Sequence, residues 1–220
     1  MENLYPMRIN KYLAWKKIST RRGADELIEK KKVFINGKLA MLGSKVKEND
    51  TVEVKGAEKK KYIYFAYNKP IGIETGSPKE GLFPLGRLDK ASHGLIILTN
   101  DGRITDQLLN PKYFHEKEYV VKTLNKLRSN FKQKMEAGVN IEGYITKKCK
   151  VNIKNDFTFR IVLTEGKKHQ IRRMCSALFQ EVADLKRERI MNIKLGNLKP
   201  NAFREIKGEE LAIFLGSMLN

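Results

Sequence analysis

The chain has 220 residues and carries 44 Lys and Arg against 25 Asp and Glu, which gives a formal net charge of +19. Because the cations are spread over the whole chain rather than confined to a tail, they predict folded surfaces that bind a polyanion such as RNA, DNA or an acidic membrane. The apolar runs are too short to cross a bilayer and the N-terminus lacks a secretion signal pattern, so we expect a soluble, cytoplasmic protein without a membrane partner.

The cysteines and histidines give no sign of a metal site. Cys149 and Cys175 are the only cysteines, and they form no Cys-x-x-Cys pair. This spacing argues against a zinc site and a disulfide framework, so we expect two free thiols. His93, His115 and His169 are dispersed and lack metal-ligand spacing, which predicts polar structural or RNA-contact roles for them.

The N-terminal part predicts a small module of helices and short strands. Apolar residues at 9 and 13 outline a short helix, and Ser19-Thr20 can cap a second helix that follows it. Asn36-Gly37 lies between two short apolar runs and is a strong hairpin signal. A strand expected over residues 51–54 closes the unit.

Cations crowd the helical part of this module. The sequence over residues 8–13, RINKYL, and the later VFING over 33–37 resemble the small RNA-binding domain named after the fourth small-subunit ribosomal protein. In that family the domain docks on structured RNA through backbone contacts, which position a protein without reading sequence. The resemblance implies RNA contacts from four residues, Arg8, Lys11, Arg21 and Arg22. The alternative is a solvated basic helix with no partner.

A polar stretch at residues 57–61 is suited to a linker, which divides the chain into an RNA-binding domain over residues 7–56 and a second domain over residues 62–220. In the second domain we expect strands over residues 62–67, 94–99, 117–122, 147–153, 158–163 and 191–194, and helices near 103–109, 127–137, 170–179 and 209–219. Strands outnumber helices and recur with short connections. The predicted fold class is therefore α+β, on a mixed, largely antiparallel sheet.

The most informative segment is residues 86–102, GRLDKASHGLIILTNDG. It places Asp89 in a glycine-bounded loop directly before an apolar strand. Because Asp89 is flanked by Arg87 and Lys90, its carboxylate should stay ionised and be available as a nucleophile or a base. The short Arg-Leu-Asp string alone is equally typical of an ordinary loop or cap residue.

The whole of this segment resembles the signature of the pseudouridine synthases, specifically the bacterial RsuA/RluF family, which modifies ribosomal RNA. The resemblance continues over nearly the whole chain, in NKPIG (68–72), HEKEYV (115–120), TKKCKV (146–151), EGKKHQIRRM (165–174) and RIMN (189–192). The third and fifth of these strings look most like the RluF-type branch. The sequence departs from the family pattern in two places, which leaves undecided which uridine is modified. The segment between residues 72 and 86 looks shortened, and Lys168-His169 stands where RluF-type members usually carry Asn-Arg.

The resemblance implies an isomerase that converts a specific uridine of large-subunit (23S) ribosomal RNA to pseudouridine, with a transfer-RNA uridine as a possible second target and with no cofactor and no metal. Asp89 matches the essential carboxylate, which either attacks the anomeric carbon or takes a proton from the neighbouring ribose carbon. Tyr119 matches the tyrosine that stacks on the base, and Arg172 the arginine that pairs with the aspartate. Without the motif, Tyr119 would equally suit a core position and Arg172 a solvated helix.

Four further cations are expected to contact RNA around the catalytic site. These are Lys69, which also shapes the pocket edge, Arg87, Lys168 and Arg173. Two other classes of protein remain open, a non-catalytic ribosome-binding or assembly protein that uses the same two modules as an RNA clamp, and a glycosylase that releases the base. A clamp should tolerate the loss of charge at Asp89, whereas an isomerase should not. We expect a monomer.

Overall fold

The computed structural model describes residues 5–56 and 61–219, and the predicted linker at 57–61 lies outside these residues except for Lys61. Contacts between residues divide the chain into two compact units, each with a hydrophobic core of its own. Within the described residues, the first unit comprises residues 5–56, 61–62, 101–104 and 219, and the second comprises residues 63–100 and 105–218.

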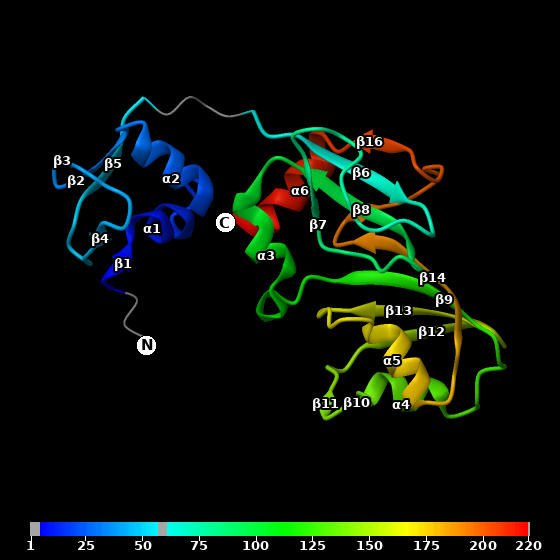
Figure 1. The fold of residues 1–220 in the computed structure, drawn as a ribbon. Coiled ribbons are helices and arrows are strands. Elements are labelled where there is room, and N and C mark those ends of the chain that lie inside the picture. Colours follow the sequence, from blue (N-terminus) through cyan, green and yellow to red (C-terminus); the bar gives the residue numbers. More distant parts are fainter. Residues whose placement is uncertain (1–4, 57–60, 220) are drawn as a thin grey trace. The chain divides into compact units, whose positions relative to one another are not determined.

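The first unit combines two helices with short strands (Figure 1). Its helices are α1 (Ile9–Trp15) and α2 (Arg21–Glu29), and its strands are β1 (Met7–Arg8), β2 (Val33–Ile35), β3 (Lys38–Leu39), β4 (Lys45–Val46) and β5 (Val52–Val54). The Thr20 hydroxyl accepts a hydrogen bond from Gly23 N at 2.9 Å, which confirms the predicted cap of α2. Asn36 and Gly37 both have positive φ, as the tight turn between β2 and β3 requires.

The second unit is built on one mixed sheet, with the order β12-β13-β9-β14-β8-β6-β16 within the described residues. Strand β14 runs parallel to β8, and the other pairs along this path are antiparallel. The strands on this path are β6 (Tyr64–Lys69), β8 (His93–Thr99), β9 (Lys117–Thr123), β12 (Lys150–Asn155), β13 (Thr158–Leu163), β14 (Val182–Ile190) and β16 (Phe203–Glu205), and β7 (Phe83–Leu85) and β15 (Ile193–Lys194) pair with β8 and β14. The fold is the predicted α+β class.

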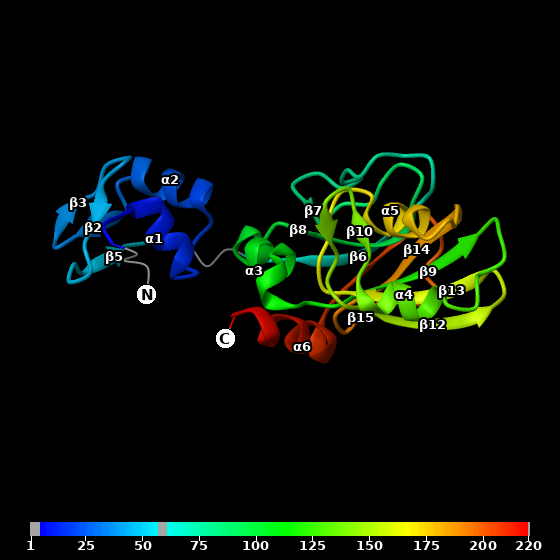
Figure 2. The same cartoon turned by 90° about the horizontal axis from the view of Figure 1, so that it is seen from below.

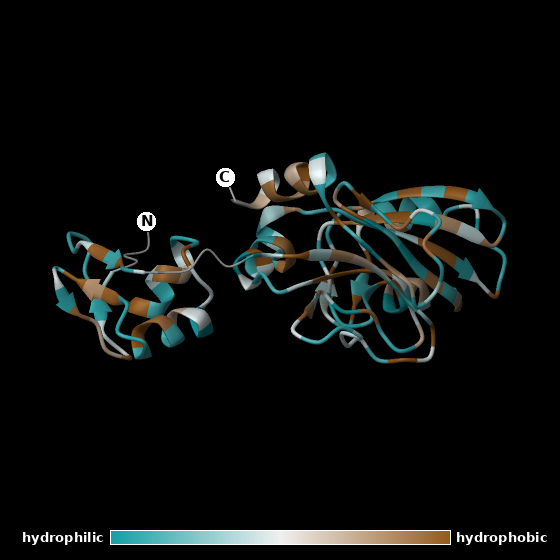
Figure 3. Ribbon diagram, turned by 90° about the horizontal axis from the view of Figure 1, so that it is seen from above, coloured by the Kyte–Doolittle hydropathy of each residue, from teal (hydrophilic) through white to brown (hydrophobic). Residues whose placement is uncertain are grey.

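Helices cover this sheet at different places. Strand β12 and its neighbours pack against α4 (Phe131–Ala137) and α5 (Gln170–Ala177), whose apolar side chains join those of the strands in one core (Figure 1). Figure 2 shows α6 (Gly208–Leu219) on the opposite side of the sheet from α5. Apolar segments are concentrated in the strands that cross the middle of the unit, as the brown stretches of Figure 3 show. A helix α3 (Thr105–Leu109) and a β10–β11 hairpin (Asn140–Ile141 with Tyr144–Ile145) complete the unit.

The main departure from the expected strands concerns β14. No strand was expected over residues 182–190, yet β14 lies in the middle of the sheet, between β9 and β8. The strand expected over residues 191–194 is reduced to the two residues of β15, which fold back on the end of β14. Strands β8 and β13 match the expected segments to within one residue.

A glycine permits the parallel contact between β8 and β14. Gly94 has φ +106°, and a Cβ atom there would lie 2.3 Å from the carbonyl oxygen of Arg187. No other residue type fits this conformation and this distance without displacing a strand. Gly94 therefore sets how closely β14 approaches the loop that carries Asp89.

Both cysteines are free, as expected. Burial raises the pKa of the Cys149 thiol and of the Cys175 thiol to about 12 each, so both stay protonated at neutral pH and are poor nucleophiles. Among the described residues, no helix is long and apolar enough to span a membrane.

Candidate active site

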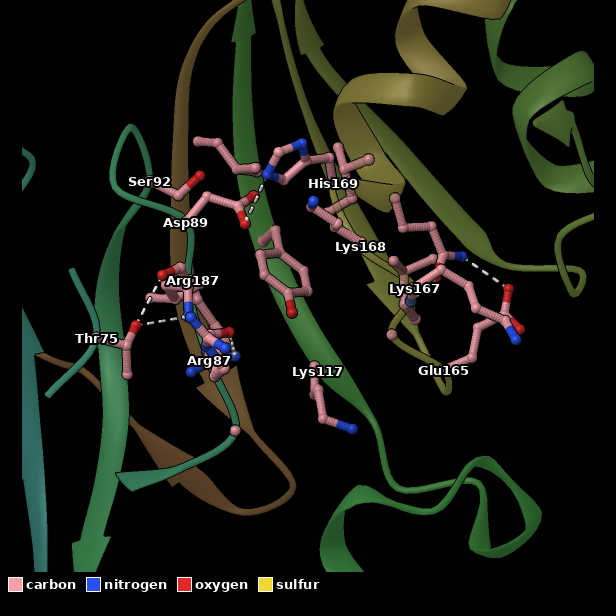
Figure 4. A pocket seen from close by; sticks show the side chains of 18 of the residues that line it. Thr75, Arg87, Asp89, Ser92, Lys117, Glu165, Lys167, Lys168, His169 and Arg187 are labelled. Carbon is pink, nitrogen blue, oxygen red and sulfur yellow. Dashed lines mark hydrogen bonds and ion pairs between the residues drawn. The ribbon is translucent and has the colours of Figure 1, made fainter. Parts of the chain in front are cut away.

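A cavity of about 750 Å³ opens in the second unit. Its walls come from the loop at residues 86–92, from strands β9 and β14, and from residues 165–171 at the start of α5 (Figure 4). Six Lys and Arg side chains and three Asp and Glu side chains line it, so a positive potential is expected inside. A polyanionic strand that enters this cavity meets complementary charge.

Asp89 lies on one wall of the cavity and is held by its loop. Its side chain is 34% exposed. The Thr75 hydroxyl accepts a hydrogen bond from Leu88 N at 2.9 Å and donates one to Leu88 O at 2.7 Å, which fixes the residue before Asp89. Ser92 N donates to Asp89 O at 2.9 Å and closes the turn after it. Hydrogen bonds to the backbone on both sides of Asp89 thus position its carboxylate.

Lys69 supplies a buried positive charge near Asp89. The prediction that Lys69 contacts RNA is wrong, because its side chain is fully buried at 0% exposure. The Lys69 ammonium donates to Pro70 O at 2.9 Å and to Ile73 O at 2.7 Å, and so braces the segment that precedes Thr75. Burial lowers the pKa of Lys69, and attraction to Asp89 opposes this shift.

Tyr119 and Arg187 face the cavity from neighbouring strands. Tyr119 on β9 pairs with Arg187 on β14, and Arg187 in turn pairs with Gly94 on β8. The guanidinium carbon of Arg187 is 6.0 Å from the centre of the Tyr119 ring. Both residues line the cavity together with Asp89. The sheet register therefore places an aromatic ring and a cation in one row, next to the loop of the acid.

Arg187 was not foreseen, and unlike Arg172 it lines the cavity. It is 2% exposed, its Nε donates to Leu95 O at 2.7 Å, and one terminal nitrogen lies 3.4 Å from Arg87 O. Its other terminal nitrogen, Nη2, is buried without a hydrogen-bond partner. Because a buried guanidinium donor is costly to leave unsatisfied, this atom is poised to bind a group that enters the cavity.

The predicted pairing of Arg172 with Asp89 is wrong. The two terminal nitrogens of Arg172 donate to Val182 O at 3.1 Å and to Ala91 O at 2.8 Å, and Arg172 does not line the cavity. From its position on α5, the side chain reaches the backbone of the loop that carries Asp89. Arg172 thus ties α5 to that loop and to the start of β14 without contacting the carboxylate.

Arg173 and Lys168 differ in their availability to RNA. Arg173 donates to the Glu142 carboxylate at 2.7 Å and to Ile141 O at 3.1 Å, so it is paired with the β10–β11 hairpin, and its contact with RNA stays a prediction. Lys168 is exposed and lines the cavity, and so does Arg87. These two cations remain predicted RNA contacts. In the first unit Arg8, Lys11, Arg21 and Arg22 are also exposed, as RNA contacts would require.

His169 approaches the acid directly. Its Nε2 lies 3.2 Å from Oδ1 of Asp89, and the dashed line in Figure 4 marks this contact. His169 has a left-handed conformation, with φ 52°, immediately before α5. The dispersed histidines had predicted only polar structural or RNA-contact roles. His93 fits the structural role, because its Nε2 lies 2.9 Å from Oδ1 of Asp184. His169 belongs to the site.

Lys117 is a second buried cation of the cavity. It precedes Tyr119 by two residues on β9 and is 8% exposed. Burial lowers the pKa of its ammonium to about 8, and the positive charge of Arg187 adds to this effect. Figure 4 shows Lys117 on β9, away from the part of the cavity where Asp89 and His169 meet. Its short spacing to Tyr119 was available in the sequence, but its burial was not.

Comparison with known proteins decides which family has this arrangement. A family model described as RNA pseudouridylate synthase matches residues 63–177, and a model described as S4 domain matches residues 7–52. This chain belongs to the RNA pseudouridine synthase family. It is an isomerase of RNA, as the motif around Asp89 predicted.

Relatives of this synthase support the assignment over most of the chain. The dual-specificity RNA pseudouridine synthase RluF of Escherichia coli K12 is 41% identical over 223 residues, which cover 93% of this chain and 77% of the relative. The ribosomal large subunit pseudouridine synthase B of Bacillus subtilis is 32% identical over 228 residues, covering 93% of each. A crystal structure of a pseudouridylate synthase aligns with a TM-score of 0.70 at 26% identity, over 94% of this chain and 98% of that one.

Proposed function

We propose that this synthase isomerises a specific uridine of 23S ribosomal RNA, or of a large-subunit precursor, and accepts a transfer-RNA uridine as a second target. The observation that carries the proposal is that Asp89, Arg187 and Tyr119 line one cavity, in which Lys and Arg outnumber Asp and Glu. The names of the two curated relatives, one dual-specific and one acting on the large ribosomal subunit, support the choice of RNA.

The reaction requires little more than these side chains. The bond from ribose C1′ to uracil N1 breaks, the detached base rotates, and a new bond joins C1′ to C5. C5 then gives up its proton to a base or to solvent and N1 takes up a proton, so the product is an isomer of the substrate. Nothing is oxidised and no group is imported. Ionised Asp89 acts at the ribose, either by attack on C1′ or by removal of the neighbouring ribose proton. Tyr119 stacks on the base and helps to remove the C5 proton.

We assign to Arg187 the role that the motif had suggested for Arg172. Its unsatisfied Nη2 atom lies in the wall of the cavity that holds Asp89, where it can bind the carboxylate or a uracil oxygen by a charge-assisted hydrogen bond. Arg172 is a positioning residue, because it acts on the loop through Ala91 O. This division gives each arginine of the site one distinct task.

Binding has to extract the target nucleotide from its stack, which costs a few kcal/mol. Phosphate contacts from Arg87 and Lys168 at the cavity offset this cost. Phosphate contacts from the first unit contribute further binding energy. We propose a monomer that acts in the cytoplasm, where ribosomal RNA is modified.

The test is to map pseudouridines in RNA from cells that carry the gene, lack it, or carry Asp89→Asn. We expect one uridine to lose its modification in the second and third strains. Purified Asp89→Asn should still bind the RNA but show no turnover, because both chemical routes need the charged carboxylate. An unchanged map in both strains would favour the non-catalytic clamp, and release of free uracil by the purified enzyme would favour a glycosylase.

A further inference from the structure

Helix α1 of the first unit presents one stripe of side chains to solvent. Residues 11, 12 and 15 follow helical spacing along this stripe, Arg8 and Lys16 flank the two ends of the helix, and Ile9 and Leu13 are fully buried on the opposite side. Arg8, Lys11, Trp15 and Lys16 are all exposed, and Tyr12 is half-buried. A large aromatic residue thus occupies the solvent side of the helix, where propensity and burial would favour a polar one.

Trp15 is held in place although it is exposed. Its side chain is 47% exposed. The centres of the Tyr12 and Tyr5 rings lie 6.1 Å and 6.3 Å from that of the indole, and Tyr5 meets it edge-on. The ammonium of Lys16 lies 4.7 Å from the centre of the indole ring. These contacts restrict the side chain, so a planar ligand that stacks on the indole would lose little conformational entropy on binding.

The charges around Trp15 favour one kind of ligand. Within the described residues, no ion pair engages Arg8, Lys11 or Lys16. An exposed indole between uncompensated cations suits a nucleotide, whose base has an aromatic face and whose phosphate is negative. An apolar protein surface would instead bury these cations at a cost. Bases within an RNA duplex are stacked on their neighbours, so the ligand is an unpaired base.

We infer that Trp15 is a stacking site for one unpaired base of the RNA substrate, with Lys11 and Lys16 on the adjoining phosphates. The inference rests on the proposed function, since it takes RNA as the substrate. It goes beyond that function because it adds a contact to single-stranded RNA on a unit otherwise expected to touch only the RNA backbone.

Trp15 is the only tryptophan of the chain, so fluorescence excited selectively at tryptophan reports on this position alone. The full chain is titrated with a short oligouridylate and with a blunt RNA duplex that carries the same number of phosphates. We expect the oligouridylate to quench the fluorescence strongly and the duplex to do so weakly. Equal quenching by both, or quenching by neither, would overturn the inference.

Substitution provides the second measurement. Trp15→Ala should raise the Kd for the substrate RNA about tenfold, whereas Trp15→Phe should retain most of the affinity because a ring remains. Met41→Ala is the matched control, since Met41 is an exposed apolar residue of the same unit at 73% exposure, and it should bind like the parent. Parental affinity of Trp15→Ala would refute the stacking site.

Two further outcomes keep this inference separate from the proposed function. If the fluorescence of the RNA-free chain is shielded from acrylamide, the indole is covered by the second unit or by another copy of the chain, and the stacking site is refuted. If the oligouridylate quenches Trp15 but the Asp89→Asn strain keeps its pseudouridine map, the assignment of the enzyme's chemistry fails and the binding site stands.

Discussion

At the scale of a single residue, the buried ammonium of Lys117 lowers the stability of the folded protein. A buried ammonium whose pKa is lowered to about 8 disfavours the folded state wherever the unfolded chain would hold the proton more tightly. Below pH 8 the full penalty applies, and it shrinks as the pH rises from 8 towards the unfolded value of 10.5. Strongly perturbed groups of this kind are typical of functional sites.

Lys117→Met should therefore stabilise the protein near pH 7, by on the order of 3 kcal/mol. The advantage over the parent should narrow as the pH approaches 10.5, because the parent lysine loses its proton there. Urea unfolding near pH 7 and near pH 10 measures both values. Lys122→Met, at an exposed position of the same strand, is the control and should change little at either pH. A destabilised Lys117→Met near pH 7 would contradict the argument.

The two arginines make a second residue-scale test. Arg187→Met should lower the isomerisation rate at saturating RNA about 100-fold or more, because a preorganised donor inside the cavity is lost. Arg172→Met should lower it less than about tenfold, since Arg172 bonds only to backbone carbonyls. Single-turnover kinetics, with circular dichroism to verify folding, measure both effects. A larger loss for Arg172→Met would restore the original assignment from the motif.

The sequence singled out those residues of the cavity that lie within contiguous strings. Asp89 and Tyr119 each stand in a short motif, so no knowledge of the fold was needed to select them. Arg187 could not be selected, because LKRER offers three cations within four residues, and only the strand register decides which one faces the cavity. His169 escaped for a related reason: its contact with Asp89 joins segments 80 positions apart, and nothing local indicates it.

At the scale of elements, β14 carries the most weight and was the least predictable. Its sequence, VADLKRERI, contains four consecutive charged residues, and the acidic residues pair across strands, as Glu188 does with Arg160 of β13. A segment rich in charge is atypical of a central strand, which explains why none was expected there. Strand β8, a continuous apolar run between glycines, was predicted closely because burial on both faces dictates its composition.

Gly94→Ala tests the junction of β8 and β14. The added Cβ would lie 2.3 Å from Arg187 O and would adopt φ +106°, so we expect a loss of about 3 kcal/mol or more in the free energy of unfolding. Gly143→Ala is the matched control, since Gly143 has φ +85° but no atom within 4 Å of the added Cβ. Its cost should be about 1 kcal/mol. Chemical denaturation compares the two, and equal losses would show that contact with β14 contributes nothing.

At the scale of the whole molecule, the net charge of +19 governs how RNA is captured. Each phosphate that a cation neutralises releases counterions, so the affinity should fall steeply as the salt concentration rises. The double variant Arg21→Ala and Arg22→Ala should flatten the log–log salt slope by about 1.5. Lys38→Ala with Lys47→Ala, two exposed cations outside the predicted RNA face, is the control. Equal slopes for the two double variants would exclude the start of α2 from the interface.

The contact between Asp89 and His169 has a consequence for how the carboxylate meets its target. One oxygen, Oδ1, faces the imidazole at 3.2 Å, so rotation of the carboxyl group about its bond to Cβ is restrained before any RNA arrives. The two oxygens are thereby made inequivalent. On the proposed function, Oδ2 is the oxygen that approaches the sugar, and the chain turn ahead of α5 makes this choice before the nucleotide arrives.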